Sequence, residues 1–144
     1  MKNLMNKFSN FLDRVSSPFI SISNWLLRLS LGMAFILHSY GKFPLPPERL
    51  TSGFEFWSIP FPEVISSLVA LGELISGIGI IVGGFISSSL GNVITRLSGG
   101  AMVVIMIGAF SLAHRDWFVS GKIFTTEQLF LFVLGLFFMI KGNK

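Results

Sequence analysis

Four apolar segments, each near the length needed to cross a lipid bilayer, are the strongest constraint on how this chain can fold. They cover residues 24–41, 64–86, 97–113 and 125–140, and a membrane-spanning helix needs about 20 apolar residues, with a lower limit near 17. The fourth segment is the tightest, so its first residues, from Thr125 to Glu127, must lie at the membrane boundary. The pattern predicts an all-α protein with four transmembrane helices.

The composition supports a membrane protein. Of the 144 residues, 51% are hydrophobic and 12% are charged, whereas soluble domains carry about 25% charged residues. A chain this short forms one domain, and it lacks the length for a separate soluble catalytic part. The basic residues are dispersed, so we expect the lipid bilayer, not a nucleic acid, as the partner. The absence of cysteine excludes disulfides, thiolate metal ligands and thiol redox chemistry within this chain.

Residues 1–18 form a separate amphipathic segment before the first span. One helical face carries the apolar residues, and Lys2, Lys7 and Arg14 lie elsewhere. This pattern predicts a helix that lies in the headgroup region and ends at Pro18, and a disordered basic tail is the alternative. Residues 19–144 then form the four-helix transmembrane domain. The apolar face consists of Leu4, Phe8, Phe11, Leu12 and Val15.

The basic residues near the ends of the spans predict the orientation. With four spans, both termini and the loop after the second span share one side, and that side has more basic residues than the other. We therefore expect a multi-pass membrane protein with both termini in the cytoplasm. The terminal side carries Lys2, Lys7, Arg14, Arg96, Lys141 and Lys144, and the other side carries Lys42, Arg49, Arg115 and Lys122.

Polar and small residues recur at helical spacing within the spans. Residues three and four apart share a helix face, and glycine on such a face lets two helices approach closely. The pattern predicts a compact antiparallel four-helix bundle with polar groups inside. The first span carries Arg28, Gly32, Phe35, His38 and Lys42, and the second carries Gly72, Ser76, Gly79 and Gly83 beside Glu73 and Gly77.

The charged residues within the spans predict a buried ion pair. At 1.5 Å per residue, Arg28 lies about 20 Å below the outer end of its span and Glu73 about 14 Å below the outer end of the second span. An arginine side chain can cover that difference. We therefore predict a structural ion pair between Arg28 and Glu73, with Arg96 as a second cation near the inner boundary.

A second polar group falls near the outer boundary. His38, Lys42, His114 and Glu127 each have an ordinary explanation alone, because a lysine can extend to the headgroups and a lone histidine often bonds a carbonyl. Together they predict a pocket for a quinone-like or other amphipathic, lipid-like small molecule, closed by the loop aromatics Phe56 and Trp57. The predicted ligand-binding residues are His38, Lys42, Glu73, His114, Glu127 and Trp57. Two histidines bind a metal or haem only when both lie at one site with further ligands, and the sequence has no closely spaced ligand pair, so it predicts no metal site.

The order of these motifs resembles the DoxX family of membrane proteins. In "LLRLSLGMAFILHSYGKF", Arg28, Gly32, Phe35, His38 and Lys42 follow the family pattern. The similarity continues through "SIPFPEVISSLVALGELISGIGIIVG" to Arg96, His114 and Glu127, so it covers nearly all of the chain after about residue 24. Ser39 stands where the family often has glycine, and "GGFISSSLGNVITRL" is longer than the usual turn.

The resemblance implies a bacterial plasma membrane protein of four helices. Members are linked to thiosulfate:quinone oxidoreduction and to membrane oxidoreductase complexes that handle oxidative stress, so the family does not fix one reaction. Three functions stay open: a quinone-linked oxidoreductase component acting with a protein partner or as a homo-oligomer, a non-catalytic assembly subunit, and a small transporter that uses Glu73 as a carrier carboxylate. The transporter lacks support because the sequence has no internal repeat.

Overall fold

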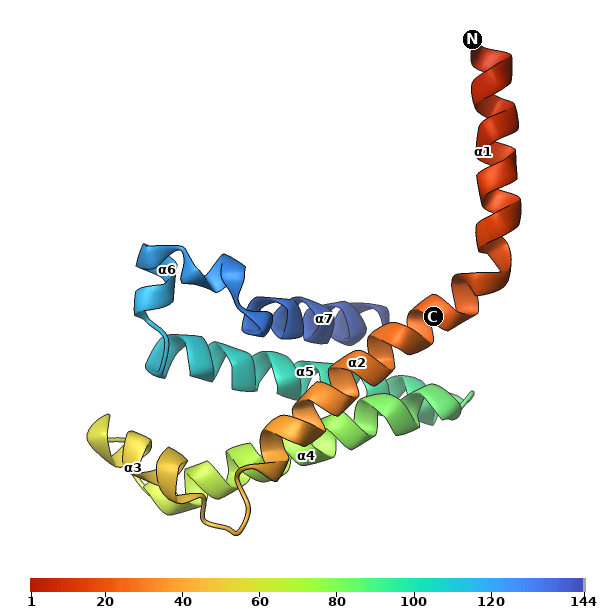
Figure 1. The fold of residues 1–144 in the computed structure, drawn as a ribbon. Helices are drawn as coiled ribbons and strands as arrows, with labels where there is room; N and C mark the ends of the chain where they lie inside the picture. The colour runs from red at the N-terminus through yellow and green to blue at the C-terminus, as the bar shows by residue number, and fades with distance from the viewer. Residues whose placement is uncertain (144) are drawn as a thin grey trace.

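The protein is built around four long helices, as seen in a computed structural model that describes residues 1–143 (Figure 1). Within these residues the chain contains no strand, so the all-α prediction is confirmed. The long helices are α2 (Ile20–Tyr40), α4 (Pro62–Phe85), α5 (Ser89–Leu112) and α7 (Glu127–Lys141). The shorter elements are α1 (Lys2–Ser16), α3 (Glu48–Phe56), α6 (Asp116–Ser120) and the 3-10 turns η1 (Ser17–Phe19) and η2 (Lys122–Thr125).

The bundle has two distinct ends and one loosely packed side. Helix α4 packs against both α2 and α5, and α5 packs against α7, whereas α2 and α7 contact each other only slightly. We call the end that carries α3 and α6 the loop end. The opposite end, where α1 leaves the bundle, α4 turns into α5 and α7 finishes, is the terminal end (Figure 1).

Glycines allow the close helix contacts in this bundle. A Cβ on Gly77 would lie 2.8 Å from the Gly32 carbonyl oxygen, so α2 and α4 cross backbone to backbone at this point. A Cβ on Gly99 would likewise lie 2.7 Å from the carbonyl oxygen of Gly135, where α5 crosses α7. The small-residue stripes of the sequence therefore mark helix contacts, as they do in other membrane bundles.

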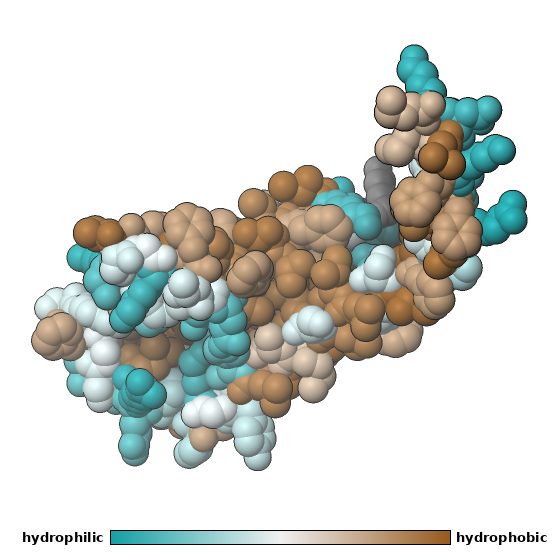
Figure 2. Space-filling view, turned by 45° about the horizontal axis from the view of Figure 1, so that its top comes forward, coloured by the Kyte–Doolittle hydropathy of each residue, from teal (hydrophilic) through white to brown (hydrophobic). Residues whose placement is uncertain are grey.

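The outer surface of the bundle is apolar. Leu37, Leu68, Val104 and Phe130 are each more than 60% exposed, and Figure 2 shows hydrophobic side chains over the middle of the molecule with hydrophilic ones gathered toward the loop end. An apolar surface of this extent indicates contact with lipid. The core between the helices contains Leu31, Phe35, Ile80, Met102, Met106, Phe110, Ile123, Leu131 and Phe138.

Three helical segments are long and apolar enough to cross a membrane: Lys2–Tyr40, Pro62–Phe85 and Ser89–Leu112. The first of these combines α1, η1 and α2. Helix α7 has 15 residues, so it rises about 22 Å and is shorter than the hydrocarbon core of about 30 Å. The fourth predicted span is therefore present as a helix but is the shortest of the four.

Helix α5 begins earlier than the sequence predicts. Its first residue is Ser89, whereas the apolar segment starts at residue 97, so Arg96 lies two turns inside the helix instead of at its opening. The first two turns carry polar residues that hydropathy alone assigns to a loop. They form helix because they pack at the terminal end, where Gly91 and Thr95 are buried.

Helix α1 extends away from the bundle. None of its residues is buried, and Figure 1 shows it running across the direction of the long helices. In Figure 2 hydrophobic side chains gather on one side of this helix and hydrophilic ones on the other. Phe8 and Phe11 are among its exposed apolar residues. The helix ends at Ser16, where the turn that contains Pro18 begins. The predicted helix and its end are therefore present.

Candidate functional site

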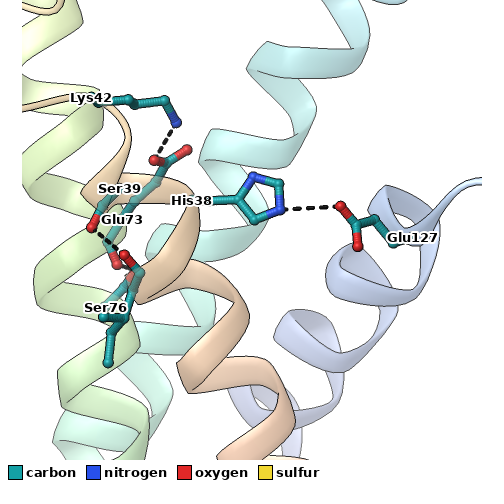
Figure 3. Close-up of polar contacts among 7 residues, drawn as sticks. His38, Ser39, Lys42, Glu73, Ser76 and Glu127 are labelled. Atoms are coloured by element: carbon teal, nitrogen blue, oxygen red, sulfur yellow. Dashed lines mark hydrogen bonds and ion pairs between the residues drawn. The ribbon is translucent and has the colours of Figure 1, made fainter.

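A buried ion pair lies in the loop half of the bundle. Helix α2 ends at Tyr40, and the side chain of Lys42 turns back so that its Nζ contacts Oε2 of Glu73 in α4 (Figure 3). The Glu73 side chain is 9% exposed and that of Lys42 is 24% exposed. The Ser76 hydroxyl donates to the Glu73 carbonyl oxygen at 3.1 Å. Lys42 is thus the charged partner that compensates the buried carboxylate of Glu73.

A second polar contact joins α2 to α7. Nε2 of His38 and Oε1 of Glu127 lie 3.2 Å apart, a hydrogen bond in which the ring N–H donates to the carboxylate (Figure 3). The two side chains are 41% and 66% exposed. His38 therefore does not bond a carbonyl in the helix core. It connects two helices that otherwise touch only slightly.

Residues from all four long helices line a partly open cavity of about 180 Å³ in the same half of the bundle. His38, Lys42, Glu73 and His114 all line it, so the structure brings these four predicted residues together. Glu127 reaches the site through its bond to His38. The remaining apolar lining residues are Phe35, Ile105, Met106, Ala109 and Leu131, and Gln128 adds one more polar group.

A wider depression of about 1040 Å³ adjoins the cavity at the loop end. The two share His38, Lys42, His114 and Gln128, so the cavity opens into this depression, which we call the vestibule. Trp57 lines the vestibule wall and does not line the cavity, and Phe56 is 84% exposed and lines neither. Only Trp57 of the two predicted aromatics therefore adjoins the site.

His114 is held in place by a neighbour that sequence reasoning missed. It follows the end of α5, and its ring stacks on Trp117 with the ring centroids 3.7 Å apart and the planes 18° from parallel. Trp117 stands three residues after His114. Nothing in the sequence pattern indicated that the two rings meet, because the short helix that begins at Asp116 was not predicted. Gln128 was missed as well, although it follows Glu127 directly.

The predicted ion pair between Arg28 and Glu73 is wrong. Arg28 is 2% exposed and donates to four neutral oxygens at the terminal end: Ile80 O at 2.8 Å, Thr95 Oγ1 at 3.1 Å, Asn143 Oδ1 at 2.6 Å and Gly142 O at 3.4 Å. Its guanidinium carbon also lies 4.7 Å from the centre of the Phe138 ring.

The helix crossing explains this error. Arg28 lies four residues before Gly32, and Glu73 lies four residues before Gly77, while Gly32 and Gly77 meet at the crossing. The helices α2 and α4 run in opposite directions. The residue four positions before the crossing in α2 therefore lies about 6 Å toward the terminal end, and the residue four positions before it in α4 lies about 6 Å toward the loop end. The two charges are therefore separated along the bundle axis, and Lys42 lies on the same side as Glu73.

Arg96 also binds carbonyls instead of a carboxylate. Its guanidinium donates to Met139 O at 3.2 Å and to Lys141 O at 3.5 Å, at the end of α7. Asn143 completes this end, since its side-chain amide donates to Gly83 O at 2.7 Å. Both arginines thus fasten the end of α7 to the rest of the bundle, and neither forms the predicted ion pair.

No metal-binding cluster of three or more histidine, aspartate or glutamate side chains occurs within residues 1–143. The polar groups of the cavity instead form two separate pairs, one joining Lys42 to Glu73 and the other joining His38 to Glu127. This arrangement provides hydrogen-bond donors and acceptors around a small space that also has apolar walls. Such a space suits a flat organic group with polar atoms at its rim.

Comparison with known proteins places the chain in a family. The family model for DoxX matches residues 24–115, which is more than half of the chain. The protein belongs to the DoxX family. The DoxX match includes His38, Lys42, Glu73 and His114 but ends before α7, so Glu127 lies outside it. Neither a curated protein nor a solved structure gives a significant match to this chain.

Proposed function

We propose that this DoxX protein is the membrane subunit of a quinone-linked oxidoreductase system and that its cavity holds the quinone head group. The observation that supports this proposal is the convergence of two histidines and the Lys42–Glu73 pair on one small cavity with apolar walls. An apolar cavity of about 150 Å³ is enough to bind benzene. The space of about 180 Å³ therefore accommodates one ring of quinone size.

The cavity residues match what a quinone ring requires. A bound quinone accepts two electrons and two protons at its two carbonyl oxygens. The Lys42 ammonium carries three N–H groups and directs one at Glu73, so another can hold a carbonyl oxygen. The rings of His38 and His114 line the same space. Glu73 and Glu127 are carboxylates already bonded to these donors, so a proton can pass along each pair. The electrons come from the redox centre of a protein partner.

The test is ligand retention by a His38→Ala variant. We expect the variant to bind a soluble benzoquinone about 5 to 10 times more weakly than the unchanged protein, because one hydrogen bond contributes about 1 to 1.5 kcal/mol. Binding is measured by titration in mild detergent, and quinone that co-purifies is measured by mass spectrometry. The thermal midpoint should stay nearly the same, because the His38 side chain is 41% exposed.

Leu37→Ala provides the control for this test. Leu37 is the neighbouring residue and is 63% exposed, so its truncation should leave binding unchanged. Equal binding by the His38 variant and the unchanged protein would refute the quinone site. Lack of quinone binding by the unchanged protein, together with recovery of a stoichiometric enzyme partner, would favour the assembly-subunit function instead.

One observation supports that second function. Several aromatic side chains at the loop end are exposed, with Phe56, Phe61 and Phe124 each more than 70% accessible. Exposed aromatics of this kind occur where proteins meet membrane interfaces or other proteins. The quinone proposal and the assembly proposal both require a partner at this membrane, and only the first requires the cavity residues.

We further propose that the protein lies in a bacterial inner membrane with the terminal end in the cytoplasm. Helix α1 then lies along the cytoplasmic headgroups, because its apolar face turns toward lipid and Lys2, Lys7 and Arg14 turn toward water or lipid phosphates. Two observations support this placement: α1 runs across the bundle direction (Figure 1), and none of its residues is buried.

Single introduced cysteines test this orientation without background, since the chain has none of its own. Ser52→Cys and Ser120→Cys at the loop end should react with a membrane-impermeant maleimide added to intact cells. Asn6→Cys and Ser87→Cys at the terminal end should react only after the membrane is permeabilised. The opposite pattern would reverse the orientation, and a different result for Asn6 and Ser87 would contradict the four-helix topology.

A further inference from the structure

The contact between α2 and α7, which we call the seam, differs from the other three contacts between long helices. The crossing of α2 with α4 is closed by Gly32 and Gly77, and that of α5 with α7 by Gly99 and Gly135. Helix α4 also packs closely on α5. Between α2 and α7 the helices touch only slightly, so no backbone contact of this kind seals that side of the cavity.

At the level of the cavity, a polar bridge spans this seam. His38 from α2 and Glu127 from α7 meet at 3.2 Å, and both side chains are largely accessible. One turn below His38 on the same face of α2 is Ala34, whose small side chain is only partly buried. One turn beyond Glu127 along α7, Phe130 exposes an apolar side chain. The seam therefore joins the cavity to an apolar outer surface through two side chains.

The size of the cavity limits what it can hold. A volume of about 180 Å³ is close to the space of about 150 Å³ that binds a single benzene ring. A ring that carries a long alkyl or isoprenoid tail is too large to fit entirely inside. The tail must therefore leave the cavity, either through the vestibule into water or through the seam into lipid, and an apolar tail favours lipid.

We propose that the cavity takes a lipid-borne quinone whose tail passes between α2 and α7, with the hydrogen bond between His38 and Glu127 as the gate. This inference rests on the proposed function, because it assigns the class of quinone and its path to the same site. The head group lies among His38, Lys42 and His114. The tail lies in the seam beside Ala34, and the vestibule admits only small, water-soluble quinones.

A reversible cross-link across the seam tests this inference. In a His38→Cys/Glu127→Cys variant, a short bis-thiosulfonate reagent ties α2 to α7, and a reducing agent releases it. The probes are a tailless benzoquinone and its decyl-tailed derivative with the same ring substituents. We expect the cross-link to weaken binding of the tailed probe at least tenfold and that of the tailless probe less than twofold, and reduction should restore binding.

Each measurement compares the double variant with and without the cross-link. The effect of removing the His38 and Glu127 side chains is the same in both states and therefore cancels. A second variant, Ala34→Phe, narrows the seam without altering any residue assigned to the head group. It should produce the same difference between the two probes. Leu37→Phe is the matched control, because it adds a similar side chain to an exposed position on the same helix, and it should change neither affinity.

The outcomes separate this inference from the proposed function. Unchanged binding of the tailed probe in both the cross-linked protein and the Ala34→Phe variant would overturn the seam as its path. An equal loss of both probes would also overturn it, since the seam would then have no selectivity for the tail. Failure of the unchanged protein to bind either probe would refute the quinone site itself, and the inference with it.

Discussion

Replacing Lys42 with Met should lower the free energy of unfolding by about 3 to 5 kcal/mol. Lys42 is the charged partner of Glu73, whose side chain is only 9% exposed, and a buried charge that loses its partner typically costs this much. Chemical unfolding in mild detergent, followed by tryptophan fluorescence, measures the change. A loss below about 1 kcal/mol would show that Glu73 is solvated or neutral without Lys42.

The double variant Lys42→Met/Glu73→Gln separates this effect from side-chain size. Because it removes both charges, it should be more stable than Lys42→Met alone. The Glu73→Gln single variant completes the thermodynamic cycle. Additive losses in this cycle would mean that the two groups do not interact, whatever their positions in the structure. Arg28→Met should show no coupling to Glu73→Gln, because the two lie on opposite sides of the helix crossing.

Replacing Gly77 with Val should cost about 3 kcal/mol, at the upper end of the usual range for overpacking. A Cβ at this position would lie 2.8 Å from the Gly32 carbonyl oxygen and 3.0 Å from the Ile36 nitrogen. Both are backbone atoms, so α2 would have to move away from α4. The thermal midpoint in detergent measures the loss of stability.

Gly108→Val is the matched control for this change. Gly108 lies within a long helix as well, one turn before the end of α5, but nothing lies within 4 Å of a Cβ built on it. Since valine and glycine differ by less than about 0.5 kcal/mol in helix propensity, its effect should be small. Similar losses for both variants would mean that the Gly77 effect comes from the backbone and not from the contact between α2 and α4.

Hydropathy and helical spacing predicted most of this fold, because membrane helices must be apolar on the outside and small where they touch. The apolar segments located α2, α4 and α7 to within a few residues. The start of α5 was missed because its first turns are polar. These turns pack against other residues at the terminal end, and hydropathy averaged along the sequence does not detect such packing.

The site was predicted in part, for a physical reason. Helical spacing places His38 and Lys42 near one end of α2, and it places His114 near the same end of α5. Spacing along single helices does not give the register between helices, so Arg28 was paired with Glu73 instead of Lys42. The crossing of Gly32 with Gly77 fixes that register, and it was present in the sequence as two glycine stripes whose alignment was unknown.

The neutral environment of Arg28 affects how the protein responds to an electrical potential. Arg28 and Arg96 are both bound by uncharged oxygens, whereas Lys42 lies against a carboxylate in the loop half. The bundle therefore carries an excess of positive charge toward its terminal end. In an energised membrane, moving one charge across 100 mV changes the free energy by about 2.3 kcal/mol. A membrane potential that is negative on one side thus stabilises the orientation in which the terminal end faces that side. This stabilisation is lost when the membrane is depolarised.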